Sequence, residues 1–162
     1  MAKRSDIQIK QDITEYINNH GIMSLSTQYS EGPWICTVYY GLDDDMNFYI
    51  VTDPNSIHGK AMEKDNRVAF SIFDSNQKIT DSLKGIQGSG VIEIIKNPIT
   101  IAKALLLWHK RNPGIENAIT LEDIKKLTDT KVFKITPTYF KFFNKELYGD
   151  DEYGIWDMKK SK

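Results

Sequence analysis

The sequence predicts a mainly β protein, in which about six antiparallel strands form a closed or partly closed barrel with helices at its periphery. Strand-like runs follow one another through short polar turns, which favours antiparallel pairing. Gly85, Gly88 and Gly90 lie inside one long strand-like run, and glycines in such positions bend sheets. A barrel is the natural outcome because it removes exposed sheet edges.

The composition fits one compact domain over residues 1–162, with a core at about 13–143 and an acidic, aromatic tail at 144–162. The chain has 162 residues, of which 40% are hydrophobic and 27% charged, enough to bury a core. Its net charge of -1 argues against nucleic acid as a partner. No apolar run has the length of a membrane span, so no membrane partner is expected. The single Cys36 and the lack of a signal-peptide core predict a cytoplasmic protein.

The first elements are a helix over Ser5–Asn19, which carries an apolar stripe and stops before Gly21, and a strand over Ile22–Thr27. After a Gly-Pro turn, strand-like runs at Ile35–Tyr40 and Met46–Thr52 flank an acidic turn, Leu42–Asp45. We interpret that turn as a hairpin tip with exposed acids. A metal site is not expected, because no His or Cys lies near it in sequence.

A polar corner, Asp53–Ser56, then opens a helix over Ile57–Lys64. Thr52, Asn55 and Ser56 supply small hydrogen-bonding groups, and His58 and Lys60 supply nitrogen donors. Because the first turn of a helix has unpaired N–H groups and a partial positive charge, it attracts phosphate. The alternative is that Asn55 and Ser56 are ordinary helix caps.

The second half begins with a strand at Arg67–Phe73 and the Gly-rich strand Lys84–Ile95, where Gln87 offers an amide. Pro98 then opens a helix over Ile99–Lys110 that is apolar on almost all sides. In a chain of this size, we expect a second subunit to cover its extra apolar face.

The last elements are a short helix at Leu121–Leu127 and aromatic-rich runs at Lys131–Ile135 and Tyr139–Phe143. These two runs are either a strand pair or one strand interrupted by Pro137.

Motifs for familiar chemistry are missing. The sequence has no dinucleotide-binding or Walker-type glycine loop and no Gly-x-Ser-x-Gly elbow. Its histidines, His20, His58 and His109, lack metal-site spacing. We interpret Cys36 as a small core residue. No catalytic side chain can be named, so in an enzyme a bound cofactor would carry the reaction.

Four segments in order, GPWICTVYYGLDDDMNFYIVTD, SIHGKA, NRVAFSI and KGIQGSGVIEI, resemble the FMN-binding split-barrel proteins related to pyridoxamine 5'-phosphate oxidase. The resemblance spans about Ile13 to Phe143. It implies an FMN-binding homodimer with the flavin at the subunit boundary. True pyridoxamine 5'-phosphate oxidases have an Arg-rich C-terminal substrate segment. This chain ends instead in FKFFNKELYGDDEYGIWDMKK, which argues against vitamin B6 oxidation.

The resemblance also implies site residues. Family members often carry Lys where this chain has His58, so Ser56, His58 and the nearby Lys60 would hold the phosphate. Gln87 falls where a flavin-contacting glutamine is often found. Trp108 would cover the ring from the other subunit. The positions that match the flavin-ring wall are Thr37, Val38, Tyr39, Val51 and Thr52.

The expected function is an FMN-dependent oxidoreductase of the flavin reductase or oxidase type, acting on a small molecule. One alternative is a non-catalytic flavin- or haem-binding protein of the same fold, with His20 or His109 as axial haem ligand. Deazaflavin is a further cofactor option. A nucleic-acid-binding barrel with stacking aromatics such as Trp34 is opposed by the near-neutral charge.

Overall fold

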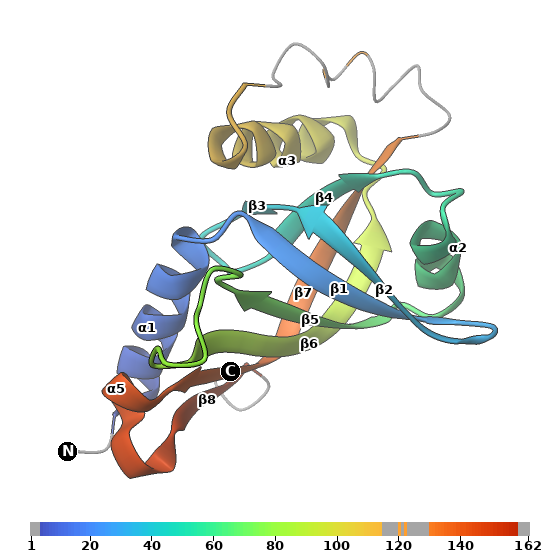
Figure 1. Ribbon diagram of the computed structural model, residues 1–162. Helices are drawn as coiled ribbons and strands as arrows, with labels where there is room; N and C mark the ends of the chain where they lie inside the picture. Colours follow the sequence, from blue (N-terminus) through green and yellow to red (C-terminus); the bar gives the residue numbers. More distant parts are fainter. Residues whose placement is uncertain (1–3, 115–119, 121, 123–129, 159–162) are drawn as a thin grey trace.

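A computed structural model describes residues 4–114, 120, 122 and 130–158. Within these residues, eight strands form one curled antiparallel sheet, a half-barrel with helices around it (Figure 1). The strands are β1 (Ile22–Tyr29), β2 (Gly32–Tyr39), β3 (Gly41–Leu42), β4 (Phe48–Thr52), β5 (Arg67–Phe73), β6 (Lys84–Ile94), β7 (Lys131–Asn144) and β8 (Tyr153–Asp157). The helices are α1 (Asp6–Asn18), α2 (Ile57–Lys64), α3 (Pro98–Arg111) and the single turn α5 (Lys145–Tyr148).

The strand order is β2-β1-β5-β6-β7-β4-β3, with β8 paired to β7. The expected antiparallel, mainly β architecture is therefore confirmed, although eight strands replace the expected six. The two runs that flank the acidic turn do not pair with each other. Instead β2 forms a tight hairpin with β1, from Ile22 opposite Tyr39 to Tyr29 opposite Gly32, and β4 pairs with β7 and the short β3.

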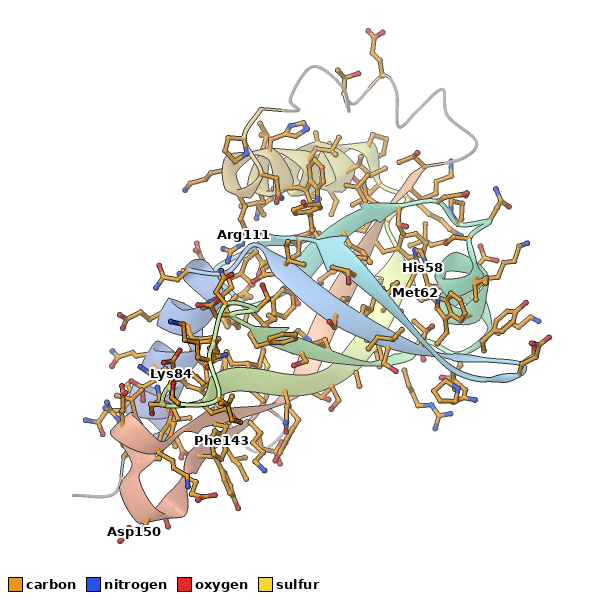
Figure 2. The ribbon with its side chains drawn as sticks, viewed as in Figure 1. His58, Met62, Lys84, Arg111, Phe143 and Asp150 are labelled. Atoms are coloured by element: carbon orange, nitrogen blue, oxygen red, sulfur yellow. The ribbon has the colours of Figure 1, made fainter. Side chains whose placement is uncertain are left out.

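Side chains alternate between the two faces of the sheet, and one face encloses an aromatic core. The ring centroids of Phe48 and Phe70 are 5.2 Å apart, and those of Phe70 and Phe140 are 5.7 Å apart. The Trp156 ring stacks on the Phe140 ring, with their centroids 5.5 Å apart. α1 and α2 pack onto this core at opposite ends of the strands, and Met62 of α2 belongs to it (Figures 1 and 2).

β7 is one continuous strand that runs through Pro137. The proline is tolerated because the register with β6 shifts between Ser89 and Gly90. A Cβ at Gly90 would lie 2.5 Å from the Thr136 carbonyl oxygen, so only glycine allows this close approach. The C-terminal residues expected as a tail also fold: β8 pairs with β7 and buries Trp156.

α3 lies over β3 and β4 and buries Ala104, Leu105 and Trp108. The expected second apolar face is solvent-exposed in the single chain, where Ile99 is 81% and Leu106 71% exposed. The expected helix at Leu121–Leu127 lies outside the described residues, apart from Glu122. No helix in the described part of the chain is long and apolar enough to cross a membrane.

Candidate functional site

The corner between β4 and α2 is built around the N-cap of α2, Ser56. The Ser56 hydroxyl accepts from the Gly59 N–H at 3.1 Å and donates to the Asp53 carbonyl at 2.6 Å. A Cβ at Gly59 would lie 2.5 Å from the carbonyl oxygens of Asp53 and Pro54, so the turn packs tightly against the helix. The capping interpretation of Ser56 is therefore confirmed, and the same contacts fix the hydroxyl in place.

His58, labelled in Figure 2, lies at the start of α2 and contacts two side chains of the corner. Its Nε2 lies 2.7 Å from the Thr52 hydroxyl oxygen and 3.1 Å from that of Ser56. Burial lowers the pKa of the half-buried His58 imidazole, and the Asp53 carboxylate opposes this shift. The neutral ring is therefore favoured in the ligand-free protein, where it offers one N–H donor and no charge.

The corner has the chemistry of an anion site. The Thr52 hydroxyl, the His58 imidazole and the N–H groups of α2 that precede Gly59 are donors at this corner, and the Ser56 hydroxyl between them already donates to the Asp53 carbonyl. The exposed Lys60 lies on the same helix and supplies the positive charge that neutral His58 lacks. A phosphate could accept from several of these groups at once.

The residues expected along the flavin ring are divided between two faces. Thr37 and Tyr39 of β2 lie on the outer face of the sheet, whereas Val38 points into the core. Gln87 of β6 is on the outer face, in one register row with Thr37 across β1 and β5. Three strand spacings, about 14 Å, separate the two, so they could contact one long ligand but not each other. Val51 packs in the smaller cluster beneath α3.

Trp108 has a packing role. It is only 4% exposed, and its indole N–H donates to the Tyr39 carbonyl at 3.3 Å. A Cβ at Gly41 would lie 2.6 Å from the Trp108 backbone nitrogen, so α3 rests directly on β3 at this point. Too little of the indole is exposed to lie over a partner's flavin, and we leave Trp108 out of the proposed site.

The other two histidines, His20 and His109, differ in how accessible their ring nitrogens are to a ligand. Among the described residues, the buried Nε2 of His109 has no hydrogen-bond partner. His20 places Nδ1 2.7 Å from the Tyr16 carbonyl oxygen and lines an outer-face pocket of about 430 Å³. Two pocket residues, Ser24 and Ser71, could not be identified from the sequence. The period-2 alternation places each on the outer face of its strand, but only the strand order brings them together.

No family model and no curated protein matches the chain. Solved structures do match it. One is a Clostridium acetobutylicum protein related to general stress protein 26, of the pyridoxinephosphate oxidase family, with a TM-score of 0.70, 15% identity, and coverage of 98% of this chain and 100% of that one. The fold is a split β-barrel of the pyridoxine phosphate oxidase kind.

Two other matching structures are described as a haem-binding protein and a haem storage protein. The haem-binding protein of Mycobacterium smegmatis has a TM-score of 0.71 and 17% identity, and the match covers 98% of this chain and 60% of that one. The haem storage protein HutZ of Vibrio cholerae has a TM-score of 0.65 and 13% identity, with coverage of 80% and 89%. At these identities, the likeness shows the split-barrel fold and leaves the ligand open.

Proposed function

We propose that this split barrel binds FMN, holds the phosphate at the corner between β4 and α2, and acts as an FMN-dependent oxidoreductase of the flavin reductase or oxidase type on a small molecule. The observation that carries the proposal is the convergence of the Thr52 and Ser56 hydroxyls on His58 Nε2 at the start of α2. The structural neighbour from the pyridoxinephosphate oxidase family supports it.

In this proposal the chain supplies binding and orientation. The Thr52 hydroxyl and the first N–H groups of α2 donate to the phosphate, and His58 and Lys60 add nitrogen donors. The Ser56 hydroxyl joins them by turning its proton from the Asp53 carbonyl to the phosphate. Outer-face residues such as Thr37 contact the ring. Bound FMN would supply hydride transfer through its flavin ring.

The proposal includes a second copy of the chain. Ile99 and Leu106 form a solvent-facing apolar stripe on α3, because they lie on the same side of the helix about two turns apart. Light scattering at micromolar concentration should report a dimer, and Leu106→Glu should dissociate it. Gln11→Glu introduces a charge at an exposed position of α1, away from this stripe, and serves as the control. A monomeric wild-type chain would contradict this part of the proposal.

An absorbance scan of the purified protein, before and after FMN is added, tests the proposal directly. The double variant Ser56→Ala with His58→Ala should bind FMN at least about tenfold more weakly, because two phosphate donors are lost. Ser5→Ala is the matched control, since Ser5 caps α1 with the same geometry but lies outside the corner. Unchanged affinity in the double variant would reject the corner as the phosphate site.

Haem binding without turnover is the second candidate, favoured by the neighbours that are described as binding haem. His20 has the more accessible ring nitrogen and is the better axial candidate, whereas His109 Nε2 is buried. A Soret band that moves on binding and is lost in His20→Ala would favour this function. A yellow protein with flavin absorbance would favour FMN.

A further inference from the structure

The outer face of the sheet carries a pocket of about 430 Å³ where β1, β2 and β5 lie side by side. Its floor is a row of hydroxyls. Ser24 of β1 is paired with Thr37 of β2 on one side and with Ser71 of β5 on the other. Neighbouring strands are about 4.8 Å apart, so one small molecule could reach all three hydroxyls.

His20 stands at the edge of this pocket and is held firmly. Its ring stacks on Tyr16, with centroids 4.1 Å apart, and its Nδ1 lies 2.7 Å from the Tyr16 carbonyl oxygen. The Tyr16 hydroxyl donates in turn to the Lys84 carbonyl at 3.1 Å. Arg111 of α3, which is labelled in Figure 2, donates to the His20 carbonyl at 2.7 Å, which fixes the backbone as well.

These contacts set the chemistry of the imidazole. A carbonyl oxygen only accepts, so Nδ1 carries the proton and Nε2 of the neutral ring is an acceptor. No described residue forms a hydrogen bond to that Nε2. A histidine whose Nδ1 is held by a hydrogen bond, and whose Nε2 has no partner in the described part of the chain, is suited to binding a ligand.

The remaining walls define the ligand class. Phe73, 49% exposed, and Ile22, 44% exposed, offer apolar surface for a flat ring. Asp74 adds a carboxylate, and none of the described residues that line the pocket is a Lys or Arg. An anion would therefore find no cation here, whereas N–H groups would find two acceptors.

We propose that this pocket binds a small, uncharged nitrogen heteroaromatic that carries an amino group. The amino N–H groups donate to His20 Nε2 and Asp74, the ring nitrogens accept from the Ser24 hydroxyl and from that of one neighbour, Thr37 or Ser71, and the ring lies against Phe73. Thr37 is also an expected flavin contact, and Ser24 and Ser71 lie between it and Gln87. A flavin that contacted Thr37 alone would lie beside the ligand, whereas one that also reached Gln87 would compete with it. That consequence alone rests on the proposed function, and the pocket does not.

The test uses the full chain freed of flavin, with 2-aminopyrimidine as the probe. The ¹³C-edited spectrum of the His20 Cε1–Hε1 group should shift and saturate as the probe is added. Ser24→Ala should weaken binding about fivefold through one lost hydrogen bond, and His20→Ala should weaken it by at least as much. Ser26→Ala, on the same strand and face but outside the pocket, should change nothing.

Benzoate is the matched anionic probe and should give no saturable shift. The proposal is overturned if 2-aminopyrimidine gives none, if benzoate binds equally well, or if Ser24→Ala and Ser26→Ala behave alike. Because flavin is absent, a negative result here leaves the FMN proposal standing. Conversely, loss of the FMN proposal would not alter these shifts.

Discussion

The two turns at the ends of β4 are both polar, yet they differ in how their side chains are used. The acidic turn before β4 is closed upon itself. The Asp43 carboxylate accepts from the backbone N–H groups of Asp45 and Asn47, at 3.0 and 2.8 Å, from the Asn47 side-chain amide, and from the Tyr49 hydroxyl at 2.9 Å. Little of its hydrogen-bonding capacity is left for a ligand.

The corner after β4 is organised differently. His58 Nε2 lies within hydrogen-bonding distance of two hydroxyls, and Lys60 extends into solvent. Helix N–H groups at the start of α2 lack partners within the helix. The comparison teaches that a polar cluster in a sequence becomes a candidate site only where the fold leaves donors or acceptors unused.

The largest expected effect is on the closed turn. Asp43→Ala should lower the free energy of unfolding by about 3 kcal/mol, because several partly buried donors lose their acceptor. Burial and the Asp43 carboxylate raise the pKa of Tyr49, so the same change should lower that pKa. Urea unfolding and ultraviolet titration measure the two effects. Asp44→Ala, at the exposed neighbour, should lower the free energy of unfolding by less than about 0.5 kcal/mol. Equal losses of stability in the Asp43 and Asp44 variants would contradict the proposed difference between the two turns.

The next prediction distinguishes the role of Ser56 as a helix cap from its proposed role in binding phosphate. Aspartate and asparagine both cap helices well, so Ser56→Asp and Ser56→Asn should keep stability within about 0.5 kcal/mol of wild type. Only aspartate places a negative charge beside the proposed phosphate, and it should weaken FMN binding at least about tenfold relative to Ser56→Asn. Fluorescence titration of FMN measures the affinity. Equal affinities in these two variants would leave Ser56 with a capping role alone.

A smaller gain is expected at His58. His58→Lys replaces a neutral donor with an ammonium and should tighten FMN binding about fivefold, as one charge-assisted hydrogen bond does. His58→Gln keeps a neutral donor and is the control. Tighter binding in both variants, or in neither, would show that charge at this position does not govern the affinity.

The smallest effect is a pH dependence of stability in the ligand-free chain. Burial lowers the pKa of His58 in the folded protein, so its stabilising contribution is present above the ordinary value of about 6.5 and is lost as pH falls through the lowered pKa. The loss should stay below about 1 kcal/mol because the ring is half-exposed. Urea unfolding between pH 5 and pH 7.5 should show it in wild type and not in His58→Gln. The same dependence of stability on pH in wild type and in His58→Gln would contradict this prediction.

The sequence predicted the local elements around the corner well. The helix at Ile57–Lys64 and the strand at Arg67–Phe73 have the expected bounds, because caps, a tight turn and simple alternation specify them. The Ser56 cap was foreseen as the alternative to phosphate binding. The long strand that begins at Lys84 was also predicted. Its predicted end, Ile95, is one residue later than the observed end, Ile94.

Pairing between distant segments was harder to predict. Nothing local says that β4 pairs with β7, or that β8 returns to β7 and buries Trp156, because register depends on the whole sheet. For the same reason the row of Ser24, Thr37 and Ser71 went unnoticed. The burial of Trp108 was equally hard to predict, since the close packing of its helix on Gly41 is a tertiary feature.

The central claim is that the corner between β4 and α2 binds the phosphate of FMN, and a paired titration with FMN and riboflavin tests it most directly. The two ligands share the flavin ring and differ in the phosphate. Wild type should bind FMN at least about tenfold more tightly than riboflavin, and the Ser56→Ala, His58→Ala double variant should abolish that difference. Equal affinity of wild type for the two flavins, or a preference for FMN that survives in the double variant, would contradict the account.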